Sequence, residues 1–148
     1  MRTITPIMAL LLCLPASSAF AQDAADAMPR TASPAGAEVY IQSPANGAQV
    51  TSPFTVRFGL RGMGIAPAGT TAPNTGHHHL LIDVDTLPPD NLPLPANDQV
   101  RHFGAGQTET ELELPPGRHT LQLVLGDALH VPHQPPVRSE KITITVVE

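Results

Sequence analysis

Imidazole side chains are the groups in this chain whose type and spacing could do chemistry. The seven histidines are grouped rather than scattered: His77, His78 and His79 are consecutive, and His130 and His133 lie three residues apart. Imidazole is the commonest metal ligand in proteins, and it titrates near neutral pH. The grouping therefore predicts that a specific function of this chain would involve these histidines.

The spacing within the first group predicts which rings share a face. On a β-strand, His77 and His79 point to the same side, about 7 Å apart, so both rings could bind one ion. The alternative for this pair is a solvated strand end. His78 points to the opposite side with Leu80 and Ile82, where we expect a histidine that is hydrogen-bonded at the edge of the core.

Five histidines make up the predicted metal site. They combine a pair on a strand, a single histidine where a loop meets a strand, and a pair in a loop: His77, His79, His102, His130 and His133. None of the spacings matches a defined metal motif, so the prediction depends on the combination. The alternative for the loop pair is a polar surface role. His119 follows a Pro-Pro-Gly turn and is expected to be structural.

The available ligand atoms limit which metal such a site could take. Cys13 lies in the apolar part of the expected signal peptide, and Met63 is the single thioether after residue 37. An all-imidazole site suits Zn(II), Cu(II) or Ni(II) rather than Cu(I). Asp83 and Asp127 are candidates to accept hydrogen bonds from the ligating rings and fix their tautomers. The predicted cofactor is Cu(II) or Zn(II), and none if the histidines are structural.

Two other classes of function fit the same residues. An exported immunoglobulin-like module could bind an envelope protein or a polysaccharide, although 3% aromatic residues make a sugar-stacking platform a poor fit. A metalloenzyme is the third class, because a His-x-His strand with loop histidines resembles Cu,Zn superoxide dismutase in outline, with different spacings. The chain contains no recognisable Ser-His-Asp arrangement or Gly-rich phosphate loop, so the sequence favours a role without catalysis.

The first 21 residues predict export. Arg2 precedes an apolar run, Ile7 to Leu14, and Ala19-Phe20-Ala21 has the small-residue pattern of a signal-peptide cleavage site. The run is too short to span a membrane. We therefore expect cleavage after Ala21 and a periplasmic or secreted protein.

The charge of the mature chain excludes some partners. Loss of residues 1–21 removes Arg2 and no acid, which leaves seven Lys and Arg against 13 Asp and Glu, a net charge of −6. Nucleic-acid binding requires a basic patch, and anionic lipid attracts a polybasic segment; neither is present. We expect no nucleic-acid binding and no membrane insertion of the mature form, with an envelope partner possible.

The rest of the chain predicts a linker and one domain. Residues 22–37 contain Pro29 and Pro34 and little to bury, which predicts a disordered linker. Residues 38–148 are long enough for one core.

Within that domain, apolar and polar residues alternate with a period of two. The alternating segments are 39–41, 54–60, 78–84, 107–114, 119–125 and 141–147. Such alternation predicts strands with one face on a core and the other in water. Short strands joined by Pro- and Gly-rich turns predict an all-β fold, an antiparallel immunoglobulin-like β-sandwich with Phe58, Leu123 and Ile144 inside.

Four longer motifs resemble a known family. They are GHHHLLID at 76–83, HFGAGQTET at 102–110, LPPGRHTLQL at 114–123 and LGDALHVPH at 125–133. The chain is similar, over about residues 39–147, to small exported bacterial proteins classed as domain-of-unknown-function family 4399. The resemblance implies the domain boundaries and no particular activity.

Overall fold

The computed structural model describes residues 28–148, which form strands and loops without a helix. The predicted all-β class is therefore confirmed. The expected signal peptide, residues 1–21, and the start of the expected linker, residues 22–27, lie outside the described residues.

The nine strands are short, as the period-two segments predicted. Their bounds are β1 Glu38–Ser43, β2 Gln49–Thr51, β3 Phe54–Arg61, β4 Gly64–Ile65, β5 Thr75–Ile82, β6 Val100–His102, β7 Glu109–Leu112, β8 Gly117–Gly126 and β9 Ile142–Val147. Strands β2, β4 and β6 were not predicted, because two or three residues are too few to show a periodicity.

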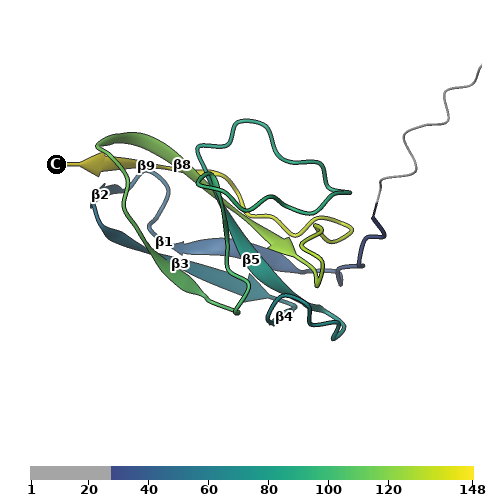
Figure 1. Ribbon diagram of the computed structural model, residues 1–148. Coiled ribbons are helices and arrows are strands. Elements are labelled where there is room, and N and C mark those ends of the chain that lie inside the picture. The colour runs from purple at the N-terminus through teal and green to yellow at the C-terminus, as the bar shows by residue number, and fades with distance from the viewer. Residues whose placement is uncertain (1–27) are drawn as a thin grey trace, which may run out of the picture.

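The strands form two sheets (Figure 1). The smaller sheet has the order β1-β3-β7, and the larger has β2-β9-β8-β5-β4 with β6 paired to β5. Most pairings are antiparallel, but β2 runs parallel to β9 and β4 runs parallel to β5. The larger sheet is therefore mixed, and the expectation of a purely antiparallel fold was wrong at these two short strands.

One hydrophobic cluster draws its residues from both sheets. It includes Val56 and Phe58 of the smaller sheet and Leu123 and Ile144 of the larger sheet. Phe58, Leu123 and Ile144 are buried, as the sequence predicted. The cluster explains why the inward residues of β3, β8 and β9 are apolar, since burial of apolar surface is the main favourable term in folding.

Strands β5 and β8 are buried on both faces, contrary to the expectation of one face in water. Every residue of β5 after Thr75 is buried, as are the last six residues of β8. The reason is a second apolar cluster, in which Leu94 packs on Leu81 and Val124, with Val84 and Leu87 against it. The Pro-rich loop after β5 thus covers the outer face of the sheet.

The segment ahead of β1 lies along residues 127–135. Thr31 donates a hydrogen bond through Oγ1 to Oδ2 of Asp127 at 2.7 Å. Ser33 donates its backbone N–H to the carbonyl of Gln134 at 3.0 Å, and Arg30 donates to the carbonyl of Pro132. These contacts join the described start of the chain to the loop that follows β8.

Leu123→Ala tests the core. Leu123 is fully buried in the cluster shared by the two sheets, and we expect its truncation to lower the free energy of unfolding by about 2–5 kcal/mol because it leaves a cavity. Leu129→Ala is the matched control, since Leu129 is 54% exposed and its truncation should cost less than about 0.5 kcal/mol. Urea unfolding measures both; equal losses would place Leu123 outside the core.

Candidate metal centre

Strand register brings three histidines to one place. In the β5–β6 ladder, His79 lies opposite His102. In the β5–β8 ladder, His77 lies opposite Gly126, the last residue of β8. Because alternate residues of a strand share a face, His77 and His79 lie on the same side of β5, and the partner strands add His102 beside them.

A tight turn after β8 adds His130. Both oxygens of the Asp127 carboxylate hold this turn: Oδ1 accepts the backbone N–H groups of Leu129 at 2.9 Å and Val131 at 3.0 Å, and Oδ2 accepts the Thr31 hydroxyl. His130 has φ of 69°, a left-handed conformation that is unfavourable for a residue with a Cβ. The hydrogen bonds of Asp127 thus fix a strained backbone that presents the His130 ring.

The rings of these four histidines are mutual neighbours. Their centroids are separated by 4.8 Å for 77–79, 5.0 Å for 77–102, 5.0 Å for 77–130, 5.2 Å for 79–102, 5.9 Å for 79–130 and 4.7 Å for 102–130. We call His77, His79, His102 and His130 the four-histidine cluster.

Three members of the cluster have ring nitrogens that lie close to one another. His77, His79 and His102 each offer a ligand atom, all within 4.8 Å of one another, and could hold a metal ion. His130 meets the group through His102, with their Nε2 atoms 3.1 Å apart. Two nitrogens bound to one zinc ion can be at most about 4.2 Å apart, twice the usual bond length, so small ring rotations would be needed.

The inner two rings have nitrogens with no hydrogen-bond partner. His77 and His79 are 1% and 0% exposed. Both nitrogens of His79 and Nε2 of His77 are buried without a partner among the described residues. Buried polar atoms are nearly always hydrogen-bonded, because leaving one unsatisfied costs about 1–3 kcal/mol.

Burial also keeps the inner rings neutral. Desolvation, followed by the neighbouring histidines, lowers the pKa of His77 to about 4 and that of His79 to about 3. Desolvation and His130 lower the pKa of His102 in the same direction. Neutral imidazole is the form that binds metals, so these rings are ready to bind at neutral pH.

The cluster is open to solvent on one side. His102 is exposed and His130 is half-buried, whereas His77 and His79 lie beneath them. His102 also borders an open hollow of about 460 Å³ lined by residues 96–98, 100–103 and 110. An ion could therefore reach the cluster past the two outer rings.

Two glycines, Gly104 and Gly126, make room for the rings, and neither was predicted from the sequence. A Cβ at Gly126 would lie 2.7 Å from Cε1 of His79 and 3.3 Å from Cα of His130. A Cβ at Gly104 would collide with the ring of His102. A glycine directly across a strand pair from one histidine, or two residues after another, is the sequence signal that could have identified them.

The fifth predicted ligand lies apart from the cluster. His133 is fully buried, and its ring nitrogens lie 3.4 Å and 3.2 Å from the backbone carbonyls of Leu125 and Thr75. Among the described residues, the His133 ring is not one of the rings that neighbour His77 and His79. Backbone carbonyls account for His133, so the structure brings together four of the five predicted histidines.

His78 points away from the cluster, as expected from the strand period. Its ring packs on Phe58 in the core, with centroids 5.0 Å apart, and Nδ1 lies 3.3 Å from the carbonyl of Gln107. Desolvation lowers its pKa, with a smaller opposing effect from that hydrogen bond.

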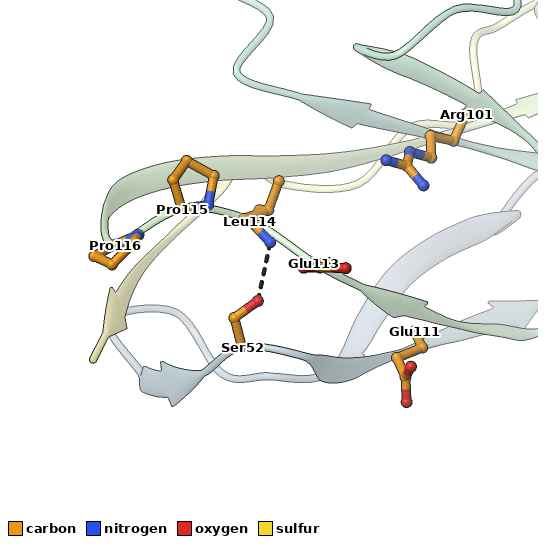
Figure 2. Close-up of a pocket in the computed structure, with 7 residues that line it drawn as sticks. All are labelled: Ser52, Arg101, Glu111, Glu113, Leu114, Pro115 and Pro116. Carbon is orange, nitrogen blue, oxygen red and sulfur yellow. Dashed lines mark hydrogen bonds between the residues drawn. The ribbon is translucent and has the colours of Figure 1, made fainter.

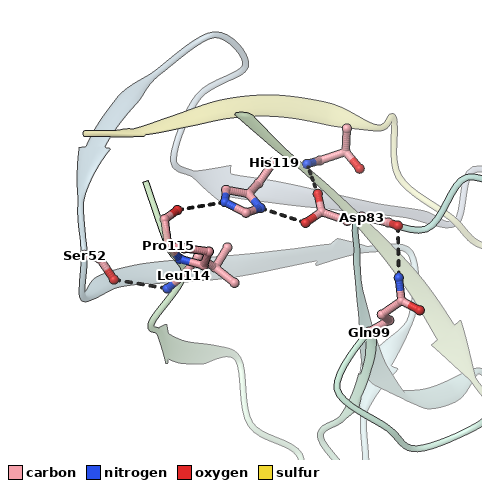
Figure 3. A network of polar contacts seen from close by, with 7 residues as sticks. Ser52, Asp83, Gln99, Leu114, Pro115 and His119 are labelled. Carbon is pink, nitrogen blue, oxygen red and sulfur yellow. Dashed lines mark hydrogen bonds and ion pairs between the residues drawn. The ribbon is translucent and has the colours of Figure 1, made fainter. Parts of the chain in front are cut away.

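The two aspartates proposed to orient ligating rings have other roles. Asp127 holds the turn that carries His130. Asp83 binds His119, with its Oδ2 2.7 Å from Nδ1, and accepts the backbone N–H of Thr120 at 2.8 Å through Oδ1 (Figure 3). Neither carboxylate bonds to a ring of the four-histidine cluster among the described contacts.

His119 is held from both sides by acceptors. Its Nε2 lies 2.9 Å from the carbonyl of Pro115, so both ring nitrogens face groups that accept hydrogen bonds, and the doubly protonated ring satisfies both. Burial by itself would lower the pKa of His119, but the hydrogen bonds to Asp83 and Pro115 and the charge of Asp83 together raise it. This contact ties the end of β5 to the start of β8.

A larger hollow of about 800 Å³ lies elsewhere, between the start of β3, the end of β7 and β6 (Figure 2). It is lined by Ser52, Arg101, Glu111, Glu113, Leu114, Pro115 and Pro116. No histidine lines this open hollow, so its larger size does not make it the candidate metal site.

The comparisons with known proteins give a family and no function. A family described as Domain of unknown function (DUF4399) matches residues 56–147. No curated protein and no solved structure matches the chain. No helix within residues 28–148 is long and apolar enough to cross a membrane.

The contact between His119 and Asp83 predicts a pH dependence of stability. Because the folded pKa of His119 is raised, its contribution is complete below the unfolded pKa of about 6.5 and is lost as pH rises through the folded pKa. The stability difference between wild type and His119→Gln should therefore shrink between about pH 5.5 and about pH 9. Urea unfolding at both values measures it; a difference that grows with pH would mean that the folded ring is neutral.

Proposed function

This chain belongs to the DUF4399 family, and we propose that it is an exported module that binds a divalent transition-metal ion through the four-histidine cluster. The observation that carries the proposal is His79, a fully buried ring with no hydrogen-bond partner at either nitrogen among the described residues. The histidines outside the cluster have a partner for at least one ring nitrogen: His133 and His119 for both, and His78 for Nδ1, although its Nε2 is buried without one. An ion would supply the missing partner for His79.

The other three members of the cluster support the same ligand. His77 adds a second buried nitrogen without a partner, and His102 offers a ligand atom within 4.8 Å of both inner rings. His130 replaces His133 as the loop ligand in this proposal. Since the donors are all imidazole nitrogens, Zn(II), Cu(II) and Ni(II) are the matching ions.

The arrangement favours binding and release over catalysis. The two outer rings, His102 and His130, face solvent and lie between it and the inner pair. We propose storage, delivery or sensing of the ion, outside the cytoplasm, after removal of residues 1–21. We also propose that the two sheets form an immunoglobulin-like sandwich, which the hydrophobic cluster shared by both sheets supports.

Replacement of His79 by leucine separates a metal ligand from a structural histidine. We expect His79→Leu to weaken Zn(II) binding at least tenfold, measured by calorimetry on protein purified without an affinity tag. Without metal, its unfolding free energy should stay equal or rise by about 1–3 kcal/mol, because an unsatisfied buried ring is replaced by an apolar side chain of similar size. His119→Gln, which removes a histidine outside the cluster, should keep full binding.

The result that would contradict the proposal is wild-type protein that binds none of Zn(II), Cu(II) and Ni(II). Destabilisation by His79→Leu would then make the histidines structural, and the module would instead bind an envelope protein or polysaccharide.

Export has its own test. Terminal sequencing of the protein secreted or recovered from the envelope should find Gln22 first, because the cleavage pattern ends at Ala21. An intact Met1 on the exported protein, or a lipid on Cys13, would overturn this prediction.

A further inference from the structure

We infer that the four-histidine cluster is a closed, tetrahedral site that favours Zn(II) over Ni(II). This inference rests on the proposed metal-binding function and specifies which ion the site takes. The preference for one ion follows from the spatial arrangement of the four rings and not from the number of histidines.

The ring separations fit a tetrahedron of imidazoles. An ion bound to four ring nitrogens at about 2.1 Å with tetrahedral angles sets the ring centroids about 5 Å apart, all six separations being equal. The six observed separations run from 4.7 to 5.9 Å. The shortest nitrogen pair, His102 to His130 at 3.1 Å, is close to the about 3.3 Å expected between two nitrogens on a tetrahedral ion.

A square arrangement of the same rings does not fit. In a square, neighbouring centroids would be about 4.5 Å apart and both diagonal pairs about 6.4 Å apart, for the same bond length. The longest observed separation is His79 to His130 at 5.9 Å, and the pair that would form the other diagonal, His77 to His102, is 5.0 Å apart. Since this second diagonal falls within the range of the four sides, 4.7 to 5.2 Å, the rings do not form a square around a common centre.

The surroundings oppose a change to planar geometry. His79 is pressed against Gly126, where even one added carbon would lie 2.7 Å from its ring, and its strand is paired on both sides. His130 is fixed by the Asp127 turn. Cu(II) and Ni(II) prefer square or tetragonal sites, whereas Zn(II) has no electronic preference and is usually tetrahedral.

Four imidazoles around one ion leave no coordination position for a substrate. Catalytic zinc sites keep such a position, and sites with four protein ligands are closed. The same geometry therefore assigns the cluster to holding an ion rather than to hydrolysis on it.

Co(II) is the probe that reports this geometry, because four-coordinate Co(II) absorbs visible light far more strongly than six-coordinate Co(II). We expect the exported protein, from Gln22 onward, to show the intense four-coordinate spectrum when loaded with Co(II). With equimolar Zn(II) and Ni(II) added to apo protein, metal analysis should find at least ten times more Zn(II) bound. A weak six-coordinate Co(II) spectrum, or Ni(II) bound at equal or greater occupancy, would overturn the inference.

His130→Gly tests whether the site is closed. Glycine suits the left-handed backbone at this position, where φ is 69°, so the variant should fold at least as well as wild type. Loss of one imidazole should shift the Co(II) bands, because water takes the place of the missing nitrogen, and should lower Zn(II) affinity at least tenfold. An unchanged spectrum in this variant would mean three ligands and an open position. If the wild-type protein bound no metal at all, the proposed metal-binding function itself would be wrong.

Discussion

The register of β5 against its neighbours is the constraint on which both the core and the cluster depend. Leu80 and Ile82 enter the core from one face, while His77 and His79 occupy the other. Because side chains alternate, a slip of one residue would move histidines into the core and leucines out of it. The apolar residues thus fix the position of the histidines, and metal is not needed to align them.

The contact between His119 and Asp83 and the four-histidine cluster lie at opposite ends of the paired strands β5 and β8. The start of β8 is joined to the end of β5 by the contact of His119 with Asp83, with partners for both ring nitrogens. The other end of β8, at Gly126, lies beside His77 and His79, where Nε2 of His77 and both nitrogens of His79 are buried without a partner among the described residues. At the first end both ring nitrogens of His119 have hydrogen-bond partners. At the second end buried ring nitrogens lack partners, which costs free energy, and this is the pattern expected where a ligand completes a site.

The sequence predicted elements better than it predicted contacts. The alternation of Leu121, Leu123 and Leu125 was sufficient to identify a strand, because period two depends only on local geometry. Burial of the outer face of β5 was missed, since it depends on how the loop after β5, with Leu94, folds back onto the sheet. His102 and His79 were predicted to share a site, but their pairing across β5 and β6 needed the register. His133 was grouped with His130 because the two are close in sequence, which gave no sign that backbone carbonyls would lie beside the His133 ring.

The carboxylate of Asp127 connects two segments that are far apart in the sequence, the segment ahead of β1 and the turn after β8. One oxygen shapes the turn of His130, and the other is anchored by the hydroxyl of Thr31. A domain trimmed to begin at β1 would retain all four rings and still lose that anchor. The strands alone therefore do not contain every residue that shapes the His130 turn, because Thr31 lies ahead of β1.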